Sequence, residues 1–276
     1  MNNFIKRTIS GVGFAAIMLA AFLTNRYIYG SVMFLSLIIM MKEFLTMTCG
    51  KDYRYSQVLS IFSGAVLFTL IYLYKAFQFP GRLVILAFVP MFILMINSLY
   101  LKDKSKFAKF SNLYAALIYI AVPWSLLNFA VFNAAGEFNG MLLLCFFCII
   151  WGTDVGAYLF GITLGQKYGK KLFPSISPKK SWIGFWGGLF TAIAVAVALH
   201  FAGFFTFQLI HCIFMGALLC VAGVYGDLIE SQWKRHYNVK DSGNIIPGHG
   251  GLLDRFDSAL IAIPIGIIYL VVMNVL

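Results

Sequence analysis

The chain has 276 residues, of which 61% are hydrophobic and 11% are charged, and its formal net charge at pH 7 is +11. This composition excludes a soluble globular domain, because several apolar runs approach the roughly 20 residues that a helix needs to cross a bilayer. We therefore predict a multi-pass membrane protein. Its excess of Lys and Arg is expected to set topology, and no nucleic-acid partner is expected.

The apolar runs predict an all-α fold, a polytopic bundle of about nine transmembrane helices. Their approximate ranges are 8–24, 27–47, 57–77, 83–101, 110–132, 141–165, 183–201, 207–225 and 258–276. The first run resembles a signal peptide, but no small-residue cleavage site follows it, so we expect it to be retained. We divide the chain into an N-terminal region, 1–135, and a C-terminal, candidate catalytic region, 136–276, with a polar signature at 227–258.

The distribution of basic residues predicts the orientation. With nine spans and a cytoplasmic N-terminus, all of the 21 Lys and Arg residues fall on the cytoplasmic side except Arg26, Lys75 and Arg82. Cytoplasmic loops of membrane proteins collect Lys and Arg. We therefore expect an inner, cytoplasmic membrane protein whose polar residues line a cavity open to the cytoplasm.

The first five runs carry few groups suited to chemistry. Lys42 and Glu43 lie near the inner end of the second run, and we interpret them as an interfacial pair rather than as part of a site. The sixth run differs, because Asp154 lies about 20 Å along a helix from its start, within the membrane. An ionisable group at that depth indicates a functional cavity. The neighbouring Gly152 and Gly156 are expected to permit close helix packing.

A lysine-rich stretch, 167–188, follows the sixth run. Its five lysines, with Ser175, Ser177 and Pro178, are compatible with a phosphate-binding loop, although lysines there also serve topology.

The strongest concentration of charge lies between Asp227 and Asp257. If the preceding apolar helix continues, five polar side chains share one of its faces. They are Asp227, Glu230, Ser231, Lys234 and Arg235. The next segment, 238–251, has four glycines and predicts a loop whose N–H groups approach a ligand. A second helix then begins near Asp254, and its N-terminal N–H groups favour anions.

Carboxylates beside Lys, Arg and a glycine-rich turn are what phosphate chemistry needs. Mg²⁺ takes oxygen ligands and bridges phosphate oxygens, while cations and N–H groups bind the remaining charge. The residues alone therefore indicate a membrane enzyme that acts on phosphates. A hydrophilic loop with helix caps is the alternative.

The segment from Ser231 to Asp257 resembles the signature of the phosphatidate cytidylyltransferases, also called CDP-diacylglycerol synthases. The matching positions are Ser231, Lys234, Arg235, Lys240, Asp241, Gly243, Pro247, His249, Gly250, Gly251, Asp254, Arg255 and Asp257. A second block, Trp151 to Tyr158 with Ser177 to Trp182, is also similar to that family. The sequence departs at Trp233, where an aliphatic residue is usual, and at Ile183, where a Glu is usual, so any role of that acid is absent or moved.

The resemblance implies transfer of a cytidylyl group from CTP to phosphatidic acid, giving CDP-diacylglycerol and pyrophosphate for phospholipid biosynthesis. Asp227 and Asp254 are then the expected principal Mg²⁺ ligands, with Asp257, Asp154 and Glu230 bound to the ion or close to it. The expected catalytic residues are Asp227, Ser231, Lys234, Arg235, Asp254 and Asp257. The expected substrate-binding residues are Asp154, Lys179, Lys180, Lys240, Asp241, His249, Gly250, Gly251 and Arg255.

The expected partners are CTP, phosphatidic acid and the lipid bilayer, and the resemblance alone also implies a homodimer. Two other functions remain open at this point. A CTP-dependent polyprenol or phytol kinase would transfer the γ-phosphoryl group instead. An ion-coupled transporter would use Asp154 in an ion pathway, but the chain shows no inverted repeat.

Overall fold

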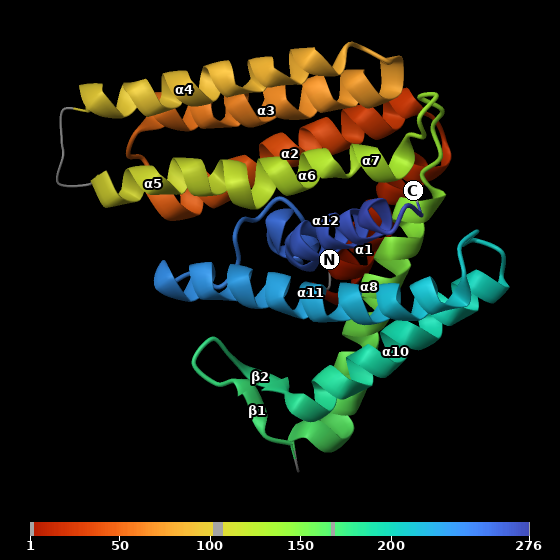
Figure 1. Ribbon diagram of the computed structural model, residues 1–276. Helices are drawn as coiled ribbons and strands as arrows, with labels where there is room; N and C mark the ends of the chain where they lie inside the picture. Colours follow the sequence, from red (N-terminus) through yellow and green to blue (C-terminus); the bar gives the residue numbers. More distant parts are fainter. Residues whose placement is uncertain (1–2, 102–106, 167–168, 276) are drawn as a thin grey trace. The chain divides into compact units, whose positions relative to one another are not determined.

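A computed structural model describes residues 3–101, 107–166 and 169–275, with side chains from Arg7 onward (Figure 1). Regular structure in these residues is nearly all helical, which confirms the predicted all-α class. The chain forms two compact units. The first comprises Met1–Asn139 with Tyr237–Arg255, and the second comprises Gly140–His236 with Phe256–Leu276.

The first unit contains the N-terminal helices. They are α1 (Asn3–Leu23), α2 (Arg26–Cys49), α3 (Arg54–Phe77), α4 (Phe88–Asn97), α5 (Phe107–Ala116), α6 (Val122–Leu126) and α7 (Asn128–Val131). The 3₁₀ turns η1 (Gly81–Ala87) and η2 (Ser98–Tyr100) flank α4, and the π turn η3 (Leu117–Ala121) joins α5 to α6. Helix α3 contacts both α2 and α4, and α2 contacts α5.

The core of the first unit contains a fully buried tryptophan. Trp124 donates its indole N–H to the carbonyl oxygen of Met33, at 2.9 Å, and to the Ser36 hydroxyl, at 3.0 Å. Its neighbour Pro123 lacks a backbone N–H, so it cannot complete the hydrogen-bond ladder of a continuous helix. The predicted span 110–132 is accordingly assembled from α5, η3, α6 and α7.

The second unit contains the remaining spans. They are α8 (Met141–Phe160) with its π turn η4 (Gly161–Gly165), α10 (Trp182–Phe201), α11 (Leu209–His236) and α12 (Leu253–Val272), of which the residues up to Arg255 group with the first unit. Helices α8, α10 and α11 contact one another. Residues 167–168 of the lysine-rich stretch lie outside the described ranges. Its residues 171–181 form an antiparallel hairpin, β1 (Lys171–Phe173) and β2 (Ser177–Ser181), where the sequence analysis expected a loop.

Small residues permit the close packing of α8 on α10. A Cβ atom on Gly156 would lie 2.9 Å from the carbonyl oxygen of Gly187, a separation that Cβ atoms essentially never show. Gly152 faces Val195 in the same interface. The packing role predicted for these glycines is confirmed.

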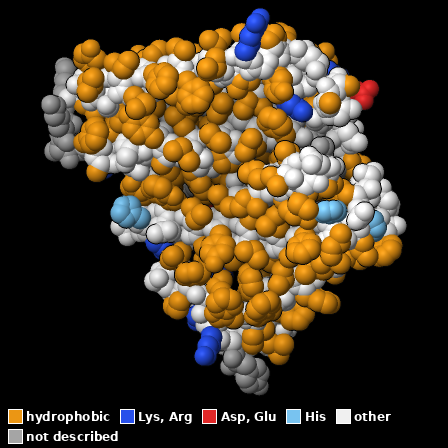
Figure 2. All heavy atoms as spheres, viewed as in Figure 1, with side chains coloured by type: hydrophobic (Ala, Val, Ile, Leu, Met, Phe, Trp, Pro, Cys, Tyr) orange, Lys and Arg blue, Asp and Glu red, His pale blue; other side chains and the backbone are white. Residues whose placement is uncertain are grey.

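Eight helical stretches among the described residues are long and apolar enough to cross a membrane. They are Arg26–Cys49, Arg54–Phe77, Gly81–Tyr100, Phe107–Val131, Met141–Gly165, Trp182–Phe201, Leu209–His236 and Leu253–Val272. The predicted first span corresponds to a shorter apolar helix, Arg7–Leu23. Figure 2 shows hydrophobic side chains over much of the visible face, as a lipid-facing surface requires. The chain is a multi-pass membrane protein.

Candidate active site

The polar face of α11 is present in the structure. The helix continues to His236, past the predicted end of its apolar run, so its acidic, hydroxyl and basic residues lie one turn apart. Ser231 donates its hydroxyl to Oδ1 of Asp227, at 3.1 Å. Ser231, one of the expected catalytic residues, therefore orients Asp227.

The second oxygen of Asp227 meets the hairpin. Lys180, near the end of β2, places its Nζ 2.6 Å from Oδ2 of Asp227. The two side chains are 27% and 31% exposed, so solvent still reaches the pair. The hairpin is also held near its turn, because Nε of Arg235 donates to the carbonyl oxygen of Ile176 at 3.4 Å. The exposed Lys179 lies beside Lys180 in the same strand.

A buried ion pair lies one turn further along α11. The Nζ of Lys234 pairs with Oε2 of Glu230, whose side chain is fully buried, whereas the Lys234 side chain is 12% exposed. An acid in that position is stable only when it is neutralised and hydrogen-bonded. Lys234, one of the expected catalytic residues, therefore neutralises the charge of Glu230 in the protein itself.

Asp257 approaches the same face from α12. A Cβ on Gly226 would lie 2.5 Å from the Asp257 carbonyl oxygen and 3.0 Å from Cα of Ser258, so glycine permits α11 and α12 to touch there. The Asp257 carboxylate accepts the Ser258 N–H at 2.6 Å. It also lies within electrostatic range of Asp227, Lys234 and Asp154. Asp154 is exposed on α8. We name the set Asp154, Lys180, Asp227, Glu230, Ser231, Lys234 and Asp257 the Asp227 cluster.

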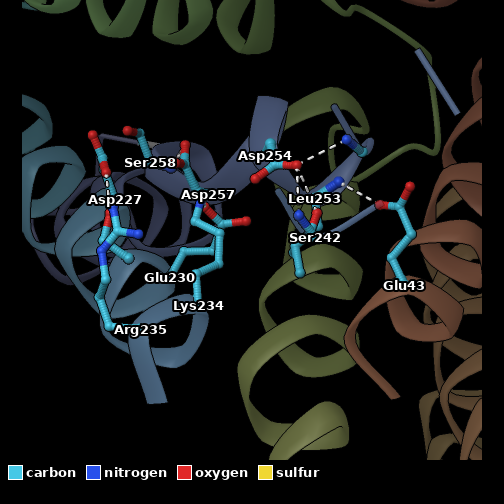
Figure 3. A network of polar contacts seen from close by, with 12 residues as sticks. Glu43, Asp227, Glu230, Lys234, Arg235, Ser242, Leu253, Asp254, Asp257 and Ser258 are labelled. Carbon is cyan, nitrogen blue, oxygen red and sulfur yellow. Dashed lines mark hydrogen bonds and ion pairs between the residues drawn. The ribbon is translucent and has the colours of Figure 1, made fainter. Parts of the chain in front are cut away.

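Asp254 lies in the first unit and is held by main-chain and hydroxyl donors. Its Oδ2 accepts the Ser242 N–H at 2.9 Å, the Ser242 hydroxyl at 2.9 Å and the Gly251 N–H at 2.8 Å (Figure 3). These contacts tie residues 237–252, the signature loop, to the first turn of α12. The Gly251 N–H, which the sequence analysis expected to approach a phosphate, is engaged by the protein's own carboxylate.

Sequence reasoning missed Glu43. This residue of α2 is 6% exposed, and its carboxylate accepts the N–H groups of Leu252, at 3.0 Å, and Leu253, at 2.8 Å. The interpretation of Glu43 as an interfacial, water-facing side chain is wrong, while Lys42 is exposed as expected. The amides of Leu252 and Leu253, at the start of α12, therefore bind an anion of the protein itself and are not free for a substrate. The signal in the sequence was a single acid within an otherwise apolar helix.

His249 contacts α1. Its Nδ1 lies 3.0 Å from the hydroxyl of Ser10, and that hydroxyl also donates to the Pro247 carbonyl oxygen at 2.9 Å. Burial, followed by the nearby charges of Arg255 and Arg7, lowers the pKa of His249 from its usual 6.5. The ring is therefore neutral at pH 7. Gly250 has a positive φ of 85°, a conformation that requires glycine. The side chains of Lys240, Asp241 and Arg255 are exposed.

Comparison with known proteins places these features in a family. The sequence pattern of the cytidylyltransferase family matches residues 5–273. The chain belongs to the cytidylyltransferase family. A phosphatidate cytidylyltransferase of Staphylococcus haemolyticus is 34% identical to this member over 84% of this chain and 85% of the relative. Relatives of the same name from Rickettsia bellii and Bacillus subtilis are 42% and 46% identical, over 54% and 45% of this chain and 64% and 46% of their own lengths.

The family resemblance inferred from the signature is thereby confirmed, and with it the nucleotidyltransferase class of enzyme. The cytidylyltransferase match also covers the first five spans, which contain none of the signature positions.

The carboxylates of the signature suit a divalent cation that takes some of its ligands from the protein and the others from a nucleotide. No three His, Cys, Asp or Glu side chains within the described ranges are grouped as a ready-made metal centre. Mg²⁺ is usually held by one or two carboxylates together with substrate phosphates, so a complete protein cage is not required. Asp227 and Asp254 have the ligand chemistry that Mg²⁺ prefers.

Proposed function

We propose that this protein transfers the cytidylyl group of CTP to phosphatidic acid. An oxygen of the phosphatidate monoester attacks the α-phosphorus of CTP, and the bond from that phosphorus to the oxygen leading to the β-phosphate breaks. The products are CDP-diacylglycerol and pyrophosphate. The observation that carries the proposal is the family match over residues 5–273.

The Asp227 cluster supports this reaction because it brings carboxylates and ammonium groups together. Lys180 and Arg235 are proposed to bind phosphate oxygens, and Ser231 to keep Asp227 oriented through its hydrogen bond. A phosphate monoester already carries a nucleophilic oxygen at neutral pH, since its second pKa is about 6, so no strong general base is needed. Positioning and charge neutralisation supply most of the catalysis.

Asp227 and Asp254 are the proposed Mg²⁺ ligands. The reason for naming them together is the sequence, because both belong to one signature. These two carboxylates would hold the ion, which when bound would supply positive charge to neutralise the phosphates in the transition state. Asp257 and Asp154 are proposed as further acids near the ion, whereas the charge of Glu230 is already balanced by Lys234.

The remaining basic residues are proposed to hold the two substrates. Lys179, Lys240 and Arg255 are exposed and carry the positive charge that phosphates require. Lys234 contributes through its pair with Glu230. His249, being neutral, contributes hydrogen bonding rather than charge, and Asp241, in the same loop, is proposed to contact substrate.

The proposed orientation places the signature loop on the cytoplasmic side of the inner membrane. It follows from the distribution of Lys and Arg, which leaves Arg26, Lys75 and Arg82 alone on the opposite side. CTP would then arrive from the cytosol and phosphatidic acid from the adjoining leaflet, through a polar cavity open to both. A homodimer is the proposed assembly.

A labelling experiment tests the reaction. Purified protein in mixed micelles with phosphatidic acid and Mg²⁺ receives CTP labelled in the cytidine or, separately, in the γ-phosphate. We expect only the cytidine label to enter lipid, and we expect Asp254→Asn to abolish this transfer. Glu137→Gln, which removes the same charge from an exposed loop, is the matched control. Transfer of the γ-label would identify a lipid kinase, and transfer of neither label would refute the proposal.

A further inference from the structure

Glu43, a residue of α2, binds backbone N–H groups of the signature region. Glu43 is the acidic residue of α2, and its two carboxylate oxygens each accept one N–H, from Leu252 and Leu253. These amides belong to the beginning of α12, where the helix leaves its first N–H groups without partners in the helix itself. The buried charge of Glu43 is stabilised there by two charge-assisted hydrogen bonds and by the helix dipole.

The signature loop is shaped around this carboxylate. A Cβ on Gly251 would lie 2.7 Å from Oε2 of Glu43 and 2.5 Å from the hydroxyl of Ser242. A Cβ on Gly243 would lie 2.7 Å from Cδ of Glu43. Both glycines therefore allow the backbone to close on Glu43, which gives these two signature positions a structural reason that involves α2.

The same few residues hold Asp254. Gly251 packs against Glu43, and Ser242 lies next to Gly251. Both residues donate hydrogen bonds to Oδ2 of Asp254. Leu253, held by Glu43, immediately precedes Asp254 in the chain. A displacement of the Leu252 and Leu253 amides would therefore move the carboxylate that follows them and weaken its three hydrogen bonds.

We propose that Glu43 is a positioning residue of the transfer reaction, one that fixes the start of α12 and hence the carboxylate of Asp254. This inference rests on the proposed function. It also assigns the amides of Leu252 and Leu253 to the protein's own Glu43, so these two N–H groups are not donors to a substrate phosphate.

The test compares Glu43→Gln with Glu137→Gln. Both variants replace one carboxylate by an amide of the same shape, but Glu137 is exposed and accepts from Asn133 in the loop before α8. In Glu43→Gln, the amide NH₂ group faces one backbone N–H, so one charge-assisted hydrogen bond is lost. Rates are measured at varied CTP, phosphatidic acid and Mg²⁺, per folded molecule. Hydrogen exchange of peptides containing Leu252 and Leu253 is measured on the same preparations.

We expect Glu43→Gln to lower kcat about tenfold and to raise the half-saturating Mg²⁺ concentration, because Asp254 is no longer held in place. The KM for phosphatidic acid should stay within about twofold, and exchange at Leu252 and Leu253 should accelerate. Glu137→Gln should match the wild type in every measurement.

Three results would overturn the inference. Unchanged exchange at Leu252 and Leu253 would show that Glu43 does not hold α12. Faster exchange with unchanged kcat and Mg²⁺ dependence would reduce Glu43 to a scaffold residue. A lower KM for CTP in Glu43→Gln would show that the helix terminus binds substrate phosphate once Glu43 is neutral. Wild-type protein without cytidylyl transfer would instead refute the proposed function.

Discussion

Asp227 and Asp254 belong to the same signature, but the structure holds them with different kinds of donor. Asp227 is paired with the ammonium group of Lys180 and with the hydroxyl of Ser231, both on side chains that can rotate. Asp254 accepts two backbone N–H groups and one hydroxyl, and the neighbouring amides are held by Glu43. The contacts of Asp227 can exchange when a ligand arrives, whereas those of Asp254 change only if the loop itself moves.

We therefore expect the contacts of Asp227 to rearrange when a ligand binds, and those of Asp254 to hold the signature loop in place. The Asp227–Lys180 pair is partly exposed, and such pairs contribute only about 0 to 1 kcal/mol to stability. Hydrogen bonds to a charged acceptor contribute about 1.5 to 3 kcal/mol each. Variants of the Asp227 cluster that leave buried charges paired should therefore affect activity more than stability, and variants around Asp254 should affect both.

Lys234→Met is expected to have the largest effect. It leaves the fully buried Glu230 without its counter-charge, which should lower the free energy of unfolding by about 3 to 5 kcal/mol. Denaturation in detergent measures this change. The double variant Glu230→Gln with Lys234→Met should recover most of the stability, and a single Lys234→Met variant as stable as the wild type would contradict the buried pair.

Asp227→Asn should lower cytidylyl transfer by about 100-fold, because the negative charge of a proposed metal ligand is lost. Its free energy of unfolding should change by less than about 1 kcal/mol. Initial rates and denaturation curves on one preparation check both values. A large loss of stability would mean that Asp227 mainly stabilises the fold.

Lys180→Met should lower the transfer rate by about tenfold, since it removes one cation from the phosphate-binding surface. Lys171→Met is the matched control, because Lys171 is an exposed lysine of the opposite hairpin strand. Rates at varied CTP distinguish the two variants. Equal rates in both would show that the Lys180–Asp227 contact has no part in the reaction.

His249 should give the smallest effect, which appears as a dependence of stability on pH. Its pKa is lowered in the folded protein, so the unfolded chain binds the proton more readily. The stability from neutral His249 is complete above pH 6.5 and is lost as the pH falls below that value. His249→Asn keeps a hydrogen-bonding group near Ser10 and should flatten this dependence. Melting temperatures between about pH 5 and 7.5 measure the change, and parallel curves would contradict it.

Helical periodicity and the family signature predicted much of the fold and one side of the site. The face from Asp227 to Arg235 followed from spacing alone, because helix geometry determines which side chains align. The apolar runs corresponded to the helices, since spanning a bilayer requires length and hydrophobicity that composition records directly.

The contacts that the sequence did not predict are those between distant segments. Glu43 lies 209 residues before Leu252, and no local spacing connects them. The same holds for Ser10 with His249, and for Lys180 with Asp227. The hairpin was also missed, because lysine is uncommon in β-strands and the two strands of this hairpin are short.

The most direct measurement of the central claim is the binding of labelled CTP to wild-type protein and to Asp227→Asn, with and without Mg²⁺, in identical micelles. We predict that Mg²⁺ strengthens CTP binding to the wild type and that Asp227→Asn removes this gain while its melting temperature stays unchanged. Equal Mg²⁺-dependent binding by the two proteins would contradict the assignment of Asp227 to the nucleotide site.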